Sequence, residues 1–170
     1  MREIVVYGDP VLTEKASPVE VFDEDLARLA AEMHAIMVKA PGVGLAAPQI
    51  GVPVQMAIVD VSVGEDPDEL HILINPEVIE AEGAQKGEEG CLSFPDITAV
   101  VDRPLRVRIR AQNLAGHVVE MQAEGFKARA FCHEIDHLNG VLMTDRVSRL
   151  KREMIKKKVQ KRVKAGTWHP

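Results

Sequence analysis

The chain has few of the residues that give small folds covalent or aromatic stabilisation. It contains two cysteines, Cys91 and Cys132, and aromatic residues make up 4% of its 170 positions. This excludes a disulfide-stapled framework and leaves Val, Leu, Ile, Ala and Met to build the core. Repeats, low-complexity tracts, a secretory signal and a basic presequence are also missing. We therefore expect one domain, 1–170, working in a reducing cytoplasm.

A long apolar run that crosses a membrane is missing as well. The stretch 40–59 carries no charge for twenty residues, but three prolines and three glycines break it, so no membrane helix is expected. Within it, 42–51 is a loop of small residues in which Gln49 is the only side chain able to donate a hydrogen bond. A tight turn between a helix and a strand is a compatible, simpler interpretation.

The strongest motif is His133-Glu134-Ile135-Asp136-His137. On an α-helix a spacing of four residues turns the chain by about 400°, so both imidazoles leave one face. They can then bind one metal ion while Glu134 stands beside a water on that ion. An amphipathic helix with two half-buried histidines is the alternative. Apolar residues at helical spacing and Gly140 as a C-terminal cap favour a helix in either case.

Cys91 is the candidate third ligand. A thiolate with two imidazoles leaves one coordination position open for water, as catalytic sites require. From the residues alone, an inert buried thiol is an equal alternative. A bond to Cys132 is disfavoured, since Cys132 precedes His133 by one residue and points about 100° away from the ligand face.

Three segments taken together resemble the signature motifs of the peptide deformylases. They are Gly42-Val43-Gly44-Leu45-Ala46-Ala47-Pro48-Gln49, Glu89-Gly90-Cys91-Leu92-Ser93 and His133-Glu134-Ile135-Asp136-His137-Leu138. The similarity extends along nearly the whole chain. One departure is Cys132, where the family often has glutamine; it lies off the ligand face and affects packing rather than chemistry.

The resemblance implies a metal-dependent amide hydrolase that removes the formyl group from N-formylmethionine of new polypeptides and releases formate. Cys91, His133 and His137 would hold one divalent ion, ferrous iron in the cell, with zinc, nickel or cobalt possible in a purified sample. Glu134 would accept the proton of the attacking water and pass it to the leaving amine. The Gln49 side chain and the Leu92 backbone N–H would stabilise the oxyanion, each by roughly 3 kcal/mol if aligned.

Substrate contacts are expected on both sides of the metal site. One helix face carries the histidines together with Phe126, the Arg129 stem and Ala130. These three are expected to form the floor of a methionine pocket, with Val43 as its opposite wall. The backbones of Gly44 and Gly90, with Pro95 nearby, are expected to pair with an extended substrate as an added strand. For Phe126, simple core packing is a compatible alternative.

Charge is concentrated at one end. Residues 151–170 hold eight Lys or Arg and one acidic residue, whereas the chain as a whole carries a net charge of −5. Leu150, Ile155, Val159 and Val163 form a narrow apolar stripe, so a helix over about 147–165 is expected to lie on the body. A solvated surface helix is one interpretation. The resemblance implies another, in which five basic residues contact ribosomal RNA phosphates: Lys156, Lys157, Lys158, Lys161 and Arg162.

The periodicities predict an α+β fold, with mixed or antiparallel sheets wrapped around the metal-binding helix, 124–139, and with further helices near both ends. The sheets are expected to present Cys91 from a strand or its end. Asp23 caps the first, which runs to about 39. Strands are expected at 54–61, 72–75, 77–82, 100–101 and 105–110, and a turn at 113–116 leads into 117–122. Alternating arginines in 106–110 indicate the wet face of a sheet, not a nucleic-acid patch. We expect a monomer with no DNA or membrane partner.

Two other classes of protein remain. A zincin-like metallopeptidase would take a third ligand downstream of the helix, where His169, in a tail expected to be frayed, is the only histidine. A non-catalytic ribosome- or RNA-binding protein would keep a closed, four-ligand structural site.

Overall fold

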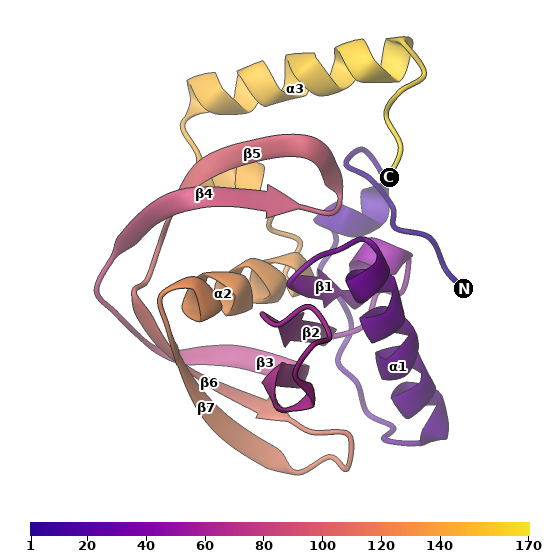
Figure 1. The fold of residues 1–170 in the computed structure, drawn as a ribbon, viewed down its shortest axis with the longest axis vertical. Coiled ribbons are helices and arrows are strands. Elements are labelled where there is room, and N and C mark those ends of the chain that lie inside the picture. The colour runs from indigo at the N-terminus through magenta and orange to yellow at the C-terminus, as the bar shows by residue number, and fades with distance from the viewer.

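Helix α2 (Phe126–Leu138) lies at the centre of the fold, with one β-sheet on each side of it (Figure 1). The computed structural model describes all residues, 1–170, and has the predicted α+β architecture. The other elements are α1 (Glu24–Lys39), β1 (Gly44–Ala46), β2 (Met56–Asp60), β3 (Leu70–Glu82), β4 (Gln85–Cys91), β5 (Phe94–Arg103), β6 (Arg106–Gln112), β7 (Val118–Glu124) and α3 (Arg149–Lys164).

Both sheets are antiparallel. The larger has the strand order β1-β2-β3-β6-β7, so β1 is an edge strand with one side free of backbone partners within the sheet. The smaller is the hairpin β4-β5, which ends in a tight connection just after Cys91. The two sheets therefore approach α2 from opposite sides, and the metal-helix motif lies between them.

Helix α2 is held by its apolar face. Phe131, Ile135 and Cys132 pack on side chains from β2, β3, β6 and β7, and Phe131 is fully buried. The opposite face carries His133 and His137 toward the β4–β5 hairpin. Gly140 follows the helix with φ +73°, the left-handed conformation that a C-terminal cap needs, as predicted.

Helix α1 forms as its sequence predicts. The Asp23 side chain accepts a hydrogen bond from the Leu26 backbone N–H at 3.0 Å and caps the first turn. Its buried residues follow helical spacing and pack on β1 and β2. They are Leu26, Ala30, Met33, Ile36 and Met37.

The predicted strand pattern was incomplete in four places. Only 100–101 was expected as a strand within β5, which runs from Phe94 to Arg103. Strand β1 was expected as a loop, because its three residues are all buried and show no alternation of polar and apolar side chains. Cys91 was expected on a strand or at its end, and it ends β4, but the residues of β4 before it were not predicted as a strand because they are polar and include two glycines. The runs 72–75 and 77–82 are one strand, β3, which continues past Pro76 through an irregularity where Asn75 has φ +49°.

The alternating arginines lie on the solvent face of the larger sheet, as expected. Arg106, Arg108 and Arg110 on β6 form ion pairs with glutamates of the adjacent strands, β3 and β7. Paired charges on neighbouring strands stabilise the sheet modestly.

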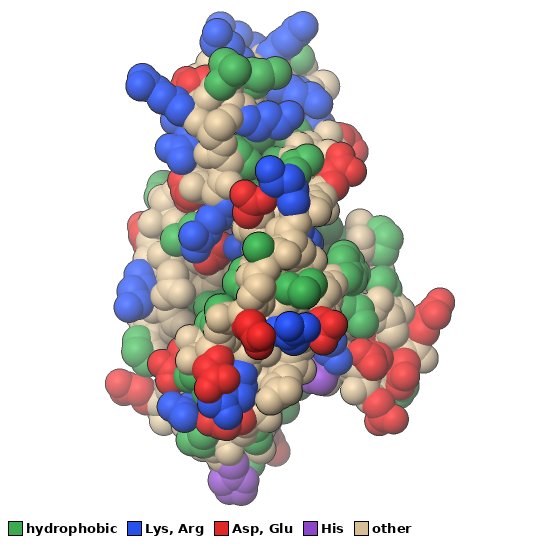
Figure 2. Space-filling model, turned by 90° about the vertical axis from the view of Figure 1, so that its left-hand side faces the viewer, with side chains coloured by type: hydrophobic (Ala, Val, Ile, Leu, Met, Phe, Trp, Pro, Cys, Tyr) green, Lys and Arg blue, Asp and Glu red, His purple; other side chains and the backbone are tan.

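Helix α3 lies on the outside of the β4–β5 hairpin. Ile155 and Val159 are buried, but Leu150 and Val163 are 74% and 57% exposed, so the apolar stripe is narrower than predicted. Basic side chains gather over this end of the molecule (Figure 2). None of the helices combines the length and apolar character needed to cross a membrane.

Replacing the buried aromatic side chain of α2 tests this packing. Phe131→Ala is expected to lower the free energy of unfolding by about 3–5 kcal/mol, because it leaves a cavity between α2 and the larger sheet. Phe126→Ala is the control: its side chain is 58% exposed, so a change within about 0.5 kcal/mol is expected. Urea denaturation measures both, and equal losses would contradict the packing described.

Candidate metal and catalytic site

Cys91, His133 and His137 meet at one point between the hairpin and α2. The Cys91 Sγ lies 3.3 Å from the His137 Nε2, which lies 3.1 Å from the His133 Nε2. Ligands of one zinc-sized ion, bound at about 2.0–2.3 Å, stand about 3.3–3.6 Å from one another, so these atoms are spaced to share an ion. The three ligand atoms all lie within 4.8 Å of each other.

The donor set fits a divalent transition metal. Two Nε2 atoms and a sulfur converge as three possible ligands, the number that catalytic zinc sites draw from the protein. Burial lowers the pKa of His137 well below its ordinary value, which favours the neutral ring that a metal ligand requires. His169 is not part of the cluster, which removes the third ligand that a zincin-like site would use.

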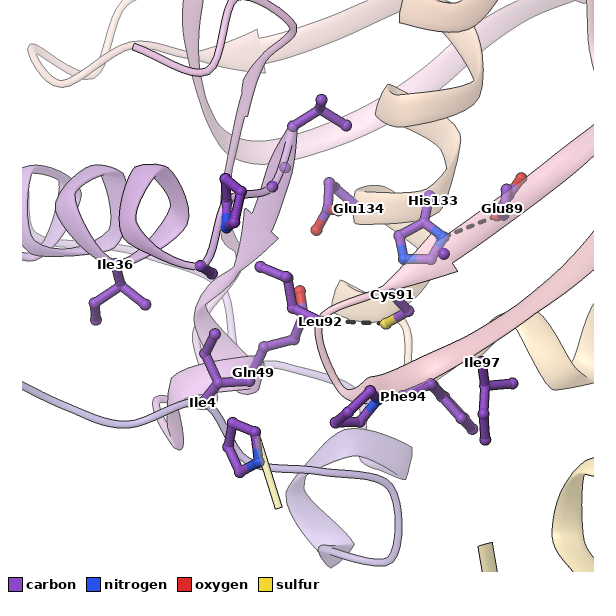
Figure 3. A pocket seen from close by; sticks show the side chains of 18 of the residues that line it. Ile4, Ile36, Gln49, Glu89, Cys91, Leu92, Phe94, Ile97, His133 and Glu134 are labelled. Carbon is purple, nitrogen blue, oxygen red and sulfur yellow. Dashed lines mark hydrogen bonds and ion pairs between the residues drawn. The ribbon is translucent and has the colours of Figure 1, made fainter. Parts of the chain in front are cut away.

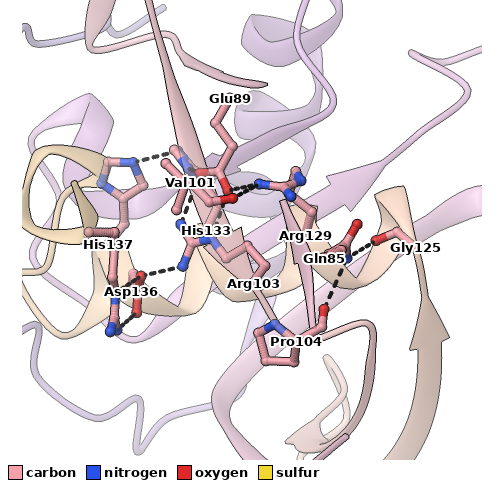
Figure 4. Close-up of polar contacts among 11 residues, drawn as sticks. Gln85, Glu89, Val101, Arg103, Pro104, Gly125, Arg129, His133, Asp136 and His137 are labelled. Atoms are coloured by element: carbon pink, nitrogen blue, oxygen red, sulfur yellow. Dashed lines mark hydrogen bonds and ion pairs between the residues drawn. The ribbon is translucent and has the colours of Figure 1, made fainter. Parts of the chain in front are cut away.

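A buried carboxylate orients His133. Glu89 Oε1 lies 2.8 Å from the His133 Nδ1, which directs the Nε2 lone pair toward Cys91 and His137 (Figure 4). Burial by itself would lower the pKa of His133, but hydrogen bonds with Cys91 and Glu89 raise it well above its ordinary value. A bound cation would compete with that proton for the ring.

Glu89 is itself held by two arginines. Arg103 contacts both of its oxygens at 2.7 and 2.9 Å, and Arg129 Nη1 lies 2.8 Å from Oε2. Arg103 also bonds Asp136, at 2.6 Å. Burial would raise the pKa of Glu89, but the hydrogen bonds from Arg103 and His133 lower it well below its usual value.

Glu134 lies beside the cluster and has a buried carboxylate oxygen without a partner. Its residue is 4% exposed and Oε2 has no hydrogen-bond partner. A Cβ at Gly44 would come within 2.6 Å of Oε1, so only glycine permits this close approach. Burial raises the pKa of Glu134 to about 7, a value suited to taking up and giving back a proton near neutral pH.

Gln49 and Leu92 lie on the other side of the cluster (Figure 3). The Gln49 Oε1 accepts a hydrogen bond from the Ala46 N–H at 3.0 Å, which points the amide nitrogen into the site. That nitrogen donates to Ser93 Oγ at 3.1 Å and lies 3.6 Å from the Cys91 sulfur. The side chain is therefore held next to the ligand sulfur, within the site.

The chain matches the family model described as polypeptide deformylase over residues 1–153. It belongs to the polypeptide deformylase family. A peptide deformylase of Acidobacterium capsulatum is 50% identical over 168 residues, which cover 99% of each chain. The crystal structure of a deformylase from Legionella pneumophila superposes with a TM-score of 0.91 at 39% identity, over 100% of this chain and 99% of that one. The structure of a peptide deformylase from Plasmodium falciparum superposes with a TM-score of 0.90 at 32% identity, over 96% of this chain and 96% of that one.

Residues from each of the three signature segments line one cleft of about 1240 Å³, among them Gly44, Cys91 and His133. All six residues predicted to bind substrate lie on it, as do Glu134, Gln49, Leu92 and Pro95. The six are Val43, Gly44, Gly90, Phe126, Arg129 and Ala130. Two details differ from the sequence analysis. Phe126 is 58% exposed and does not pack in the core. The Arg129 head group turns to Glu89 and the Val101 carbonyl.

Sequence reasoning missed Glu89, Arg103 and Ser93. In an extended strand, Glu89 and Cys91 are two residues apart and share one face, so a β4 strand would have placed Glu89 toward α2. This signal was missed because the expected strand at Cys91 was not extended back to Glu89. Cys132 is buried in the core, and burial raises its pKa to about 11, which agrees with a packing role.

The orienting carboxylate can be tested through metal affinity. Glu89→Gln is expected to weaken binding of Zn²⁺ or Co²⁺ by about 10- to 100-fold, because His133 loses the partner that fixes its tautomer. Competition with a chelator measures this. Glu88→Gln is the matched control, since Glu88 lies on the opposite strand face and bonds only Thr98; equal affinities in the two variants would contradict the role of Glu89.

Proposed function

We propose that this protein removes the formyl group from the N-terminal methionine of newly made polypeptides and releases formate. The proposal rests mainly on one observation: a cluster of three possible ligands, two of them buried histidines, with an adjacent, unpaired Glu134 oxygen at the inner end of a cleft. Membership of the deformylase family supports the same reaction. The cluster has three ligands, whereas a closed structural metal centre would need four.

One divalent ion is the proposed cofactor, held by Cys91, His133 and His137. When bound, it would supply a Lewis acid that acidifies water and polarises the formyl oxygen. Cysteine with two histidines suits ferrous iron, zinc, nickel and cobalt alike. We propose ferrous iron in the cell, following the resemblance to the family.

Glu134 is proposed to move the proton. Its carboxylate accepts a proton from the water that attacks the formyl carbon, and a new C–O bond forms. As the C–N bond breaks, the same proton passes to the methionine nitrogen, leaving a free amine and formate. The raised pKa of Glu134 suits both transfers.

Gln49 and Leu92 are proposed to stabilise the charge that develops on the formyl oxygen. The amide of Gln49 is already fixed by Ala46 and Ser93, so little reorganisation is needed when the charge forms. The Leu92 backbone N–H follows the ligand Cys91 directly in the chain. A small formyl group fits this crowded inner end better than an internal peptide bond.

The peptide portion of the substrate is proposed to run along the cleft as an added strand. Strand β1 is a sheet edge and Gly44 begins it, so its free side offers backbone groups. Gly90 and Pro95 lie on the facing side. Phe126, Ala130 and the stem of Arg129 form the proposed floor of the methionine pocket, with Val43 as its wall.

Formate release tests the activity and the role of Glu134. The metal-loaded protein is expected to release formate from formyl-Met-Ala-Ser, and Glu134→Gln is expected to lower kcat by about 10²- to 10⁴-fold with metal content unchanged. Glu88→Gln, an exposed carboxylate on the same cleft, is the control. Full activity of Glu134→Gln with metal bound would refute the mechanism.

The pH profile gives a second test. Glu134 must be ionised to accept a proton, and its pKa is raised to about 7; a bound cation lowers that value again. Activity is therefore expected to fall about tenfold per pH unit below an apparent pKa of about 7 or slightly less. The measurement is kcat/KM from pH 5 to 9, with metal content checked at each pH. A profile that stays flat down to pH 5 would contradict the assignment.

We further propose that the protein acts as a cytoplasmic monomer that docks on the ribosome through α3. Lys157, Lys158 and Lys161 are exposed and Lys156 is half-buried on this helix. Arg162 differs from them, because it bonds the Pro95 and Thr167 carbonyls at 2.6 and 2.8 Å. The four lysines are thus better placed than Arg162 to contact RNA phosphates.

Charge substitution tests docking without removing buried residues. Lys157→Gln/Lys158→Gln is expected to weaken ribosome co-sedimentation, most clearly at low salt, because each phosphate contact contributes a slope of about −0.7 to −0.9 in log K against log salt. The control, Lys15→Gln/Lys86→Gln, makes the same charge change on exposed lysines elsewhere. Equal effects of the two pairs would remove the docking proposal.

A further inference from the structure

The residues after α3, 165–170, turn back onto the body of the protein. In Figure 1 this segment runs from the end of α3 toward the N-terminal part of the chain. The Trp168 Nε1 donates a hydrogen bond to the Tyr7 carbonyl at 2.9 Å, and its ring meets Phe94 edge-on at 6.5 Å between centroids. The expectation of a frayed tail was wrong, because a large aromatic side chain anchors it.

Arg162 provides a second anchor. Its guanidinium lies 5.1 Å over the Trp168 ring and donates to the Thr167 carbonyl, which fixes the start of the tail. It also donates to the Pro95 carbonyl at 2.6 Å, in the strand that pairs with the ligand Cys91. Asp96, which has φ +61°, lies 3.7 Å from the same guanidinium. Helix α3, the tail and the β4–β5 hairpin are therefore tied together.

Beyond the anchor, His169 and Pro170 line the catalytic cleft. The inner end of the cleft is formed by buried residues, including Gln49 and Glu134 at 1% and 4% exposure. His169 and Pro170 are exposed, as are the N-terminal residues Arg2 and Glu3, which also line it. The cleft thus opens from the metal ligands toward a wall built by both ends of the described chain.

Its size leaves room for more than a formylated methionine. Pockets of roughly 300–1,000 Å³ enclose drug-sized ligands, and this cleft has about 1240 Å³. An extended peptide advances about 3.3 Å per residue, so residues beyond the first two move steadily away from the metal ligands. Figure 3 shows Ile4, Phe94 and Ile97 opposite Glu134 and His133. Residues His169 and Pro170 of the tail line the same cleft.

On the basis of the proposed deformylase activity, we infer that the tail, 166–170, is the outer wall of the substrate groove. Its His169 and Pro170 side chains contact the residues of an extended formyl-methionyl peptide that follow the second position. Trp168 and Arg162 act as positioning residues that hold this wall in place. The tail therefore favours longer nascent peptides over short ones and does not take part in bond cleavage.

A series of substrates of increasing length tests the inference. Formate release is measured from formyl-Met-Ala, formyl-Met-Ala-Ser and formyl-Met-Ala-Ser-Ala-Ala. For the unaltered, metal-loaded protein, kcat/KM is expected to rise with length. In His169→Ala/Pro170→Ala and in Trp168→Ala, the longest peptide is expected to lose about five- to tenfold in kcat/KM through KM, equivalent to one or two lost contacts, with formyl-Met-Ala unchanged.

Two control variants distinguish a loss of substrate contacts at the tail from a general loss of protein stability. Trp168→Phe keeps an aromatic ring against Phe94 and is expected to retain more of the length preference than Trp168→Ala. Lys164→Ala, an exposed residue at the end of α3, is expected to match the unaltered protein. If Trp168→Ala does not fold, the His169→Ala/Pro170→Ala variant decides the question alone.

The outcomes are distinct. A length preference unchanged in both tail variants would overturn the inference and leave the deformylase activity standing. Equal losses on short and long substrates would also overturn it, since the tail would then act only by supporting the Cys91 hairpin. No formate from any substrate with the unaltered protein would refute the proposed function, and the inference with it.

Discussion

The site depends on one buried carboxylate, Glu89. It joins the β4–β5 hairpin to α2 by accepting hydrogen bonds from Arg103, Arg129 and His133. Burying a charged group costs free energy unless its hydrogen-bond and ion-pair partners are in place. Removing one partner therefore leaves an uncompensated charge in the interior. The position of β4 against α2 is therefore strongly specified. Because Cys91 is two residues further along β4, the same contacts bring the sulfur to the two imidazoles.

The N-terminal residues hold the other half of the site. Val5 donates to the Gln49 carbonyl at 2.8 Å and accepts from Ser93 Oγ at 2.8 Å, while the Tyr7 N–H donates to the Ser93 carbonyl. This extended segment ties the loop that carries Gln49 to the turn that follows Cys91. Its Tyr7 carbonyl is also the anchor of Trp168. Both ends of the chain thus support the cleft, although neither carries a metal ligand.

Local patterns predicted the elements whose signals are contained in a single segment. Helix α1 was predicted from the Asp23 cap and its apolar spacing, and α2 from the two histidines with Gly140 after them. Strand β6 followed from alternating arginines. Strands β1 and β4 could not be found in this way. Strand β1 is short and wholly buried, so it shows no alternation of polar and apolar residues. Strand β4 has a polar sequence, and its Glu89 can be buried only because Arg103 and Arg129, from other elements, pair with it.

The sequence by itself determined the chemistry that is available: one thiol, two imidazoles at helical spacing, a glutamate beside them and a glutamine in a loop of small residues. Their types and order made Cys91, His133 and His137 candidate ligands, and the resemblance to the deformylases selected this set, which the structure brings together. Only the tertiary structure decided how those groups are supported and how far the cleft extends. Glu89 with its arginines, and Trp168 with Tyr7, are separated in sequence from their partners and are joined by packing alone, so no local pattern records them.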